Sequence, residues 1–195
     1  MGGKFSCLKR TPLRVSRSPV FQTRLFGLEG SGKRSIIAFL KHGVVAYNNV
    51  YDEANSNMHW ITHNKVRMLF WVSVNAVDKD ALTESTGVRA LIYVVDGSSP
   101  ESIAQSRDHL AQQLENVNDT PHLLIFLNKC DKPSFAFLEE AHYALGLDNI
   151  TDRHVRIYST SAITGEGIRE GIEWLCSKFY VNRGSYIPRK GGSRL

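Results

Sequence analysis

The stretch GLEGSGKRS occupies residues 27–35 and follows VFQTRLF, whose alternating polar and apolar side chains predict a β-strand. The apolar segment SIIAFL comes next and predicts a helix. Gly27, Gly32 and Lys33 fit the P-loop pattern G-x-x-x-x-G-K-[ST], in which the backbone of a glycine-rich loop surrounds phosphate groups. The last position of that pattern normally carries a hydroxyl for Mg²⁺, and here it is Arg34. The stretch therefore predicts a strand, a phosphate-binding loop and a helix, with the hydroxyl missing.

Strand-like and helix-like segments alternate along the rest of the chain. HNK, between MHWIT and VRMLFWV, predicts a hairpin turn, and Ser99 followed by Pro100 predicts the start of a helix. The remaining predicted strands are RALIYVVD, HLLIFLN and VRIYS, and the remaining predicted helices are FAFLEEAHYAL and IREGIEWLCSKFY. This order predicts an α/β fold in which about six strands form a mostly parallel sheet between helices.

The tetrapeptide NKCD, residues 128–131, follows a predicted buried strand. The Asp131 carboxylate can accept two hydrogen bonds from the ring N–H and exocyclic amine of guanine, a pair of donors that adenine does not offer. We expect the Asn128 amide to hold the neighbouring loops and face the base edge, and the Lys129 stem to lie along the base plane.

The tripeptide TSA, residues 160–162, follows the last predicted strand. Its backbone N–H groups, around Ser161 and Ala162, are predicted to point toward the guanine carbonyl oxygen. The P-loop, NKCD and TSA occur in this order, each at the end of a strand, where open α/β sheets bind their ligands. Together they predict a guanine-nucleotide site, although each alone could be an ordinary turn.

Over about residues 20–180 the chain resembles the Ras-like small GTPases, and within them the Arf and Arf-like (Arl/Sar) family. GLEGSGK is similar to the GLDAAGK of that family, and LIYVVDGSSPE, FLNKCDKP and TSAITGEGIREGIEWL parallel other segments of it. The resemblance implies the P-loop NTPase (small GTPase) fold and GTP or GDP as the ligand. The residues expected at the nucleotide are Gly27, Glu29, Gly30, Ser31, Gly32, Lys33, Arg34, Ser35, Asn128, Lys129, Asp131, Ser161 and Ala162.

Three departures from the family pattern fall where a Mg²⁺ ion and the attacking water would bind. Arg34 replaces the Thr that binds Mg²⁺, and one helical step turns the next hydroxyl, on Ser35, by about 100°. The first switch loop, residues 42–57, contains no Thr. Where the family has W-D-V-G-G-Q, this chain has WVSVNA, so Val72, Val74 and Ala76 stand at the Asp, Gly and Gln positions.

These departures predict that Mg²⁺ lacks its usual side-chain ligands and that GTP hydrolysis is weak or absent. Hydrolysis depends on Mg²⁺ to neutralise phosphate charge and on a Gln to orient the water. We therefore assign no catalytic residue and no metal ligand. Two alternatives stay open for Arg34: its guanidinium pairs with phosphate oxygens, or it points to solvent.

The charge distribution divides the chain into three parts: a basic arm at residues 1–19, an Arf-like domain at 20–182 and a flexible basic tail at 183–195. All 19 acidic residues lie in the middle part. The first six residues, MGGKFS, match the myristoylation pattern, with Gly2 as the acceptor. Since one acyl chain binds a membrane only marginally, palmitoylation of Cys7 or the basic cluster would supply a second signal. The arms predict contact with an anionic membrane surface.

The composition excludes other classes of protein. The 195 residues suit one domain, and no apolar run approaches the length that spans a membrane. The positive charge lies in the arms and not on the predicted domain, which argues against nucleic acid as a partner. Three widely spaced cysteines favour a reducing cytosol, so we expect a cytoplasmic protein that is peripheral on membranes. The final SRL resembles a peroxisomal address and is a secondary alternative.

Three functional hypotheses follow. The preferred one is a membrane-anchored guanine-nucleotide-binding protein that hydrolyses GTP little or not at all. The alternatives are a working GTPase switch with unusual loops and a scaffold with an empty pocket. Family resemblance further suggests effector or regulatory protein partners and a role in membrane or vesicle trafficking.

Overall fold

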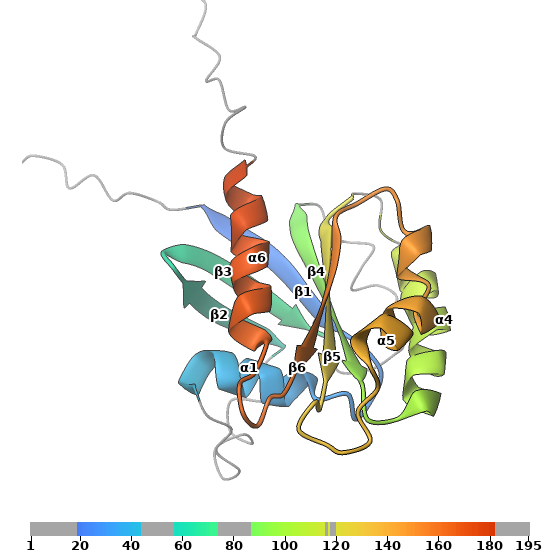
Figure 1. Cartoon of the computed structure of the whole chain (residues 1–195). Coiled ribbons are helices and arrows are strands. Elements are labelled where there is room, and N and C mark those ends of the chain that lie inside the picture. Colours follow the sequence, from blue (N-terminus) through green and yellow to red (C-terminus); the bar gives the residue numbers. More distant parts are fainter. Residues whose placement is uncertain (1–18, 44–56, 74–86, 116, 118–119, 182–195) are drawn as a thin grey trace, which may run out of the picture.

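The structure, a computed structural model, describes residues 19–43, 57–73, 87–115, 117 and 120–181 (Figure 1). The residues that it describes contain one sheet of six strands in the order β2-β3-β1-β4-β5-β6. All neighbouring strands are parallel except β2 and β3, which form an antiparallel pair. The predicted α/β fold with a mostly parallel six-stranded sheet is confirmed.

The strands match the predicted apolar runs closely. Their bounds are β1 Val20–Phe26, β2 Met58–His63, β3 Val66–Val72, β4 Val88–Asp96, β5 His122–Asn128 and β6 Val155–Thr160. The middle strands β4 and β5 are buried on both faces, as their continuous apolar sequences predicted. The predicted hairpin turn also forms, since Asn64 and Lys65 both adopt positive φ between β2 and β3.

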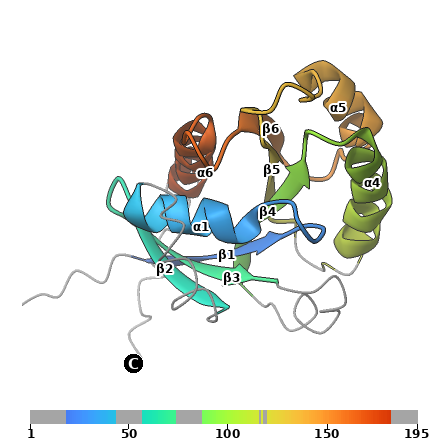
Figure 2. The ribbon, with the colours of Figure 1, turned by 90° about the horizontal axis from the view of Figure 1, so that it is seen from below.

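The helices lie on both faces of the sheet (Figure 2). They are α1 Lys33–His42, α4 Pro100–Glu115, α5 Leu138–Ala144, the short 3-10 helix η1 Leu147–Asn149, and α6 Ile168–Val181. Helices α1 and α6 cover one face, and α4 and α5 cover the other. The apolar side of α6 is buried as expected, through Ile168, Ile172, Leu175, Cys176 and Phe179.

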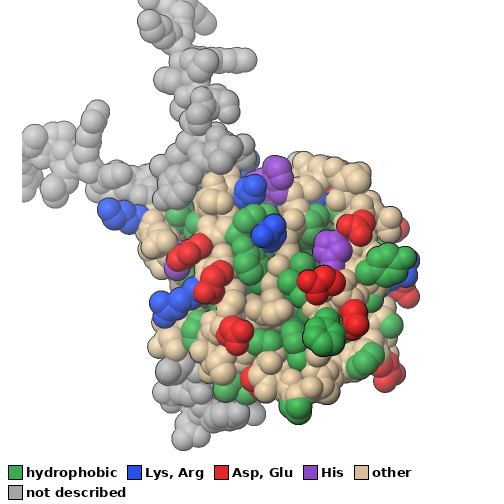
Figure 3. All heavy atoms as spheres, viewed as in Figure 1, with side chains coloured by type: hydrophobic (Ala, Val, Ile, Leu, Met, Phe, Trp, Pro, Cys, Tyr) green, Lys and Arg blue, Asp and Glu red, His purple; other side chains and the backbone are tan. Residues whose placement is uncertain are grey.

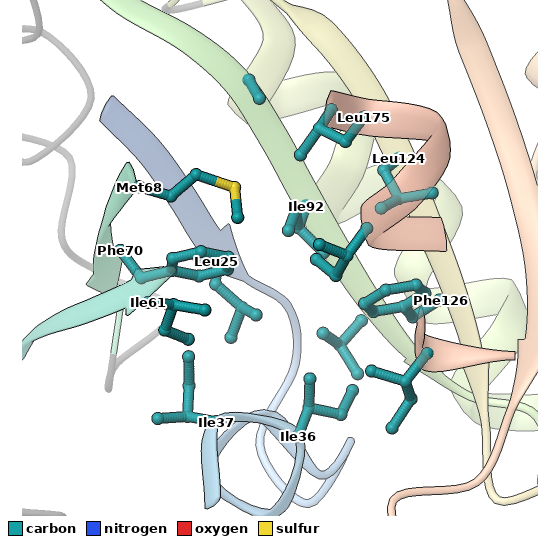
Figure 4. Close-up of a cluster of buried hydrophobic side chains, with 14 of the residues drawn as sticks. Leu25, Ile36, Ile37, Ile61, Met68, Phe70, Ile92, Leu124, Phe126 and Leu175 are labelled. Atoms are coloured by element: carbon teal, nitrogen blue, oxygen red, sulfur yellow. The ribbon is translucent and has the colours of Figure 1, made fainter. Parts of the chain in front are cut away.

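Each face of the sheet therefore has its own apolar core. Figure 4 shows the first, in which Leu25 and Ile92 of the sheet lie between Ile36 of α1 and Leu175 of α6. In the second core, side chains of α4 and α5 pack on Leu123, Ile125 and their neighbours. Burial of these side chains on two faces fixes β1, β4, β5 and β6, so the loops at their carboxyl ends are held at one edge of the sheet.

The helix predicted from FAFLEEAHYAL begins three residues later than expected. Phe135 and Ala136 are not helical, because the Ala136 N–H donates to the Gly97 carbonyl at 2.9 Å and the Phe135 ring lies over Gly97. These contacts attach the segment before α5 to the loop after β4. Tertiary packing has overridden the helical periodicity of the segment here.

Candidate nucleotide-binding site

The P-loop runs from β1 into α1 and has no room for side chains at two of its glycines. A Cβ on Gly27 would lie 2.2 Å from the Val94 carbonyl oxygen, and one on Gly32 would lie 2.2 Å from Asn128 Nδ2. Gly27, Gly30 and Gly32 also have positive φ, a conformation that glycine adopts without strain. The glycines therefore let the loop approach β4 and β5 closely and leave its backbone facing the site.

Lys33, the first residue of α1, is buried and holds the loop in shape. Its Nζ donates to the carbonyl oxygens of Gly27 and Leu28, both at 2.8 Å. Burial lowers the pKa of Lys33 to about 8, with Glu29 opposing the shift and Arg34 adding to it. The ammonium is thus desolvated and has no carboxylate in hydrogen-bond contact among the described residues, an arrangement that a phosphate group would stabilise.

A second buried polar group at the loop also fits a ligand. Ser31 is 1% exposed, and its Oγ has no hydrogen-bond partner among the described residues. Buried hydroxyls are normally paired, so this unpaired group is consistent with a polar ligand at the loop. Together with Lys33 and the glycine backbone, it shows that the residues present fit the phosphates of a nucleotide.

The loop borders a cavity of about 410 Å³. The described residues that line it are Glu29, Gly30, Gly32, Lys33, Arg34, Ser35, Val72 and Ser73. Six of these eight residues belong to the predicted phosphate site, and the other two come from the end of β3. The cavity is therefore bounded by the phosphate-binding loop on one side and by the altered family motif on the other.

Parallel register aligns the three remaining polar segments at the same edge. Asp96 of β4 lies opposite Asn128 of β5, and Asn128 lies opposite Thr160 of β6. The predicted base-binding residues are consequently neighbours in space, although Asn128 and Thr160 are 32 positions apart in the sequence.

Asn128 connects the predicted base site to the P-loop. Its Nδ2 donates to the Ser31 carbonyl at 2.8 Å, and its Oδ1 accepts from the Ala162 N–H at 3.2 Å. The side chain is 2% exposed, so both bonds are shielded from water. The expected linking role of Asn128 is present. The Ala162 N–H, which we expected to point at guanine, is bonded to Asn128 here.

Asp131 is exposed, and Ser161 fixes its position. The Ser161 Oγ donates to Asp131 Oδ1 at 2.5 Å and accepts from the N–H groups of Ile163 and Thr164, both at 3.2 Å. The carboxylate is thereby held at the mouth of the base site with one oxygen engaged. The other is open to donors such as those of guanine.

Lys129 has a partner that the sequence did not predict. Its Nζ donates to a carboxylate oxygen of Asp96, whose other oxygen accepts from the backbone N–H and the hydroxyl of Ser98. Burial alone would raise the pKa of Asp96, but the hydrogen bonds from Lys129 and Ser98 outweigh it and lower the pKa. The segment DGSS was recognisable as a polar segment after a buried strand, yet nothing in it indicated this ion pair.

Two positions at which the resembled family helps to hold Mg²⁺, directly or through water, do not fit the ion in this chain. Arg34 brings a positive charge to the first, and Val72, which is buried, brings an apolar side chain to the second. Among the described residues lining the cavity only Glu29 carries a carboxylate. No group of three His, Cys, Asp or Glu side chains suited to a metal occurs among the residues that the structure describes.

Comparison with known proteins settles the family. The model of the ADP-ribosylation factor family matches residues 15–179. This chain belongs to the ADP-ribosylation factor (Arf) family. It is 29% identical to ADP-ribosylation factor-like protein 1 of Drosophila melanogaster, over 77% of this chain and 84% of the relative. It is 30% identical to the protein of that name in Saccharomyces cerevisiae, over 77% of this chain and 83% of the relative.

Membership of the Arf family confirms the predicted small-GTPase fold and implies that guanine nucleotide is the ligand. Four residues and one segment that matter for the prediction lie outside the described residues: Gly2, Cys7, Val74, Ala76 and most of the first switch loop. The predictions made for them remain predictions.

Proposed function

We propose that this Arf-family protein binds GDP and GTP and hydrolyses GTP little or not at all. The observation that carries the proposal is the pair of hydrogen bonds from Asn128, which join the phosphate loop at Ser31 to the base loop at Ala162. This buried amide holds the phosphate loop and the predicted base loop side by side, an arrangement that suits a ligand in contact with both. The Ser161 contact that orients Asp131 supports the same conclusion.

The base-recognition part of the proposal predicts that residue 131 determines which base the site binds. The Asp131 carboxylate accepts from both donors of guanine, whereas xanthine presents a carbonyl oxygen in place of the amine. Asp131→Asn should therefore weaken GDP binding by at least about 100-fold, because two hydrogen bonds to a charged group are lost or mismatched. The same change should improve binding of xanthosine diphosphate.

Equilibrium titration of both nucleotides against the wild type and the variant is the measurement. Asp108→Asn, which removes an exposed carboxylate from α4, is the matched control and should leave both affinities unchanged. Equal GDP affinity in the wild type and Asp131→Asn would contradict the proposal.

The expected weak hydrolysis follows from the residue types at two positions of the family pattern. At the position of the family Asp, Val72 supplies no hydrogen bond to a metal-bound water, and the sequence has Ala76 in place of the water-orienting Gln. A single-turnover assay with GTP and Mg²⁺ should show phosphate release at background level. Turnover that is present in the wild type and abolished in Lys33→Ala would support the working-switch alternative.

Membrane association is the second part of the proposal. The amino end of β1 and the carboxyl end of α6, where the described domain begins and ends, lie at the end of the molecule opposite the P-loop (Figure 1). On the face drawn in Figure 3, several Lys, Arg and His side chains lie at this end. Arg89 and Lys178 are close enough to His122 to lower its pKa, after the larger effects of burial and of His154.

The basic side chains at this end and the basic arms would meet an anionic membrane together, with the acyl group on Gly2 adding apolar affinity. No described helix is sufficiently long and apolar to cross a bilayer, so the proposed attachment is peripheral. Kinship with Arf proteins suggests a function in membrane or vesicle trafficking through effector or regulatory proteins.

A further inference from the structure

Arg34 is the side chain at the nucleotide site that the proposed function leaves without a role. It is the second residue of α1 and lines the same cavity as Lys33. Arg34 is exposed, and its guanidinium forms no ion pair with any carboxylate that the structure describes. No described carboxylate therefore competes with a ligand in the cavity for this guanidinium.

The cavity has an excess of positive charge without any metal ion. Lys33 and Arg34 are both cationic, and the positive charge of Arg34 reaches Lys33, where it lowers the pKa of the ammonium after the larger effect of burial. Glu29 is the one carboxylate among the described lining residues. The amino end of α1 adds the partial positive charge of unpaired N–H groups. The charge at this site matches the phosphate groups of a nucleotide.

A nucleotide phosphate needs a counter-charge beyond the P-loop lysine, and Mg²⁺ supplies it in P-loop proteins. A guanidinium stays protonated at all physiological pH values and binds phosphate oxygens through two parallel N–H bonds. It also repels a divalent cation from the same position. Arg34 therefore supplies counter-charge to the phosphate and disfavours Mg²⁺ at the same position. Val72 offers no oxygen that could hold the ion.

We propose that this chain binds guanine nucleotide without Mg²⁺ and that the Arg34 guanidinium takes the place of the ion as counter-charge to the phosphates. The proposal rests on the proposed function, because it requires that nucleotide binds at all. It resolves the two alternatives for Arg34 in favour of phosphate binding.

The first test measures GDP affinity by calorimetric titration of the full chain in excess Mg²⁺ and in excess EDTA. The wild type should bind equally well in both, within about two-fold. Arg34→Ala should bind about ten- to a hundred-fold more weakly in both buffers, since a bidentate charged contact is lost. Arg107→Ala, which removes an exposed arginine from α4, is the matched control and should bind like the wild type.

The second test restores the family residues at two positions of the Mg²⁺ site, with Arg34→Thr and Val72→Asp together. This double variant should bind GDP tightly in Mg²⁺ and lose it in EDTA, which the wild type should not do. Since Val72 is buried, the double variant risks misfolding. In that case Arg34→Thr alone is the test, and in EDTA it should bind GDP as weakly as Arg34→Ala does.

Two results would overturn the inference. If EDTA weakens GDP binding by the wild type, the site uses a metal ion and Arg34 does not replace it; loss of that effect in Glu29→Gln would identify Glu29 as the metal ligand. If Arg34→Ala binds as tightly as the wild type, the guanidinium points to solvent. Absence of GDP binding by the wild type in either buffer would instead overturn the proposed function, and the inference would fall with it.

Discussion

At the scale of single residues, Lys33 shows how the site holds charge for a ligand. Lys33 is 8% exposed, and among the described residues its ammonium bonds only two carbonyl oxygens of the P-loop. Burial lowers its pKa to about 8, well below the ordinary value. A bound phosphate would favour the protonated form and raise the pKa again.

This linkage predicts that GDP binds more weakly as the pH rises through 8. The free protein loses the Lys33 proton in that range, whereas the complex keeps it, so binding must take up a proton. With a pKa of about 8 in the free protein, affinity should fall about four-fold between pH 7 and pH 8.5. Lys33→Arg, whose guanidinium does not titrate there, should show no such change. A wild-type affinity that is flat or rises over this range contradicts the account.

The residues at the site could be predicted from the sequence where backbone geometry or base chemistry demands one residue type. Gly32 and Asn128 are examples, because the space between them admits no Cβ. The ion pair between Lys129 and Asp96 could not be predicted, since it depends on how two strands are aligned in the folded sheet. Sequence alone also left open whether Arg34 faces the cavity, because one helical step separates a buried from an exposed position.

At the scale of elements, the P-loop conformation depends on glycine to different degrees at different positions. Gly32 has φ 100° and lies against Asn128, whereas Gly30 has φ 73° and nothing within 4 Å of an added Cβ. A side chain at Gly32 must therefore displace the amide that joins the two loops. A side chain at Gly30 would have space, and its only cost would be the backbone strain of the positive φ.

This difference predicts the outcome of two matched substitutions. Gly30→Ala should lower the free energy of unfolding by about 1 kcal/mol, the strain of a left-handed non-glycine residue. Gly32→Ala should lower it by about 2–4 kcal/mol, because it adds a clash with Asn128 and the loss of a buried hydrogen bond. Urea unfolding of the nucleotide-free proteins measures both values. Equal losses in the two variants would show that Asn128 does not depend on Gly32.

Most elements could be predicted because their own residues specify them. Ser99 begins α4 as expected, with its Oγ accepting from the Ser102 N–H at 3.2 Å. The start of α5 could not be predicted, because Phe135 and Ala136 bind Gly97, far away in the sequence. Val117 fits the helical spacing of α4 but lies after the helix ends at Glu115 and packs on the same core. Helical spacing of apolar residues therefore indicates which side chains join the core, but it does not fix the last residue of the helix.

At the scale of the whole molecule, the nucleotide site and the proposed membrane contact lie at opposite ends of the domain. The P-loop and the base loops follow the carboxyl ends of the strands, while the described chain begins at the amino end of β1 (Figures 1 and 2). A protein attached through its N-terminal arm would thus keep the nucleotide accessible from the cytosol. The predicted base-binding segments follow β5 and β6, whereas the P-loop follows β1, and Asn128 joins the two parts.

Attachment through Gly2 predicts the behaviour of two neighbouring variants in cells. Gly2→Ala removes the acylation acceptor and should move the protein from the membrane fraction to the soluble fraction, because the basic arms alone bind weakly. Gly3→Ala leaves the acceptor intact and should remain with the membranes. Cell fractionation followed by immunoblotting measures both. Membrane association that persists in Gly2→Ala would rule out acylation at this position as the anchor.

The most direct test of guanine-nucleotide binding is the nucleotide content of the purified protein. The protein is denatured, and the released nucleotide is identified by chromatography and measured against the protein concentration. We expect close to one GDP or GTP per chain, retained after purification in EDTA. A nucleotide-free protein that also fails to bind added GDP would contradict the account and favour the scaffold alternative.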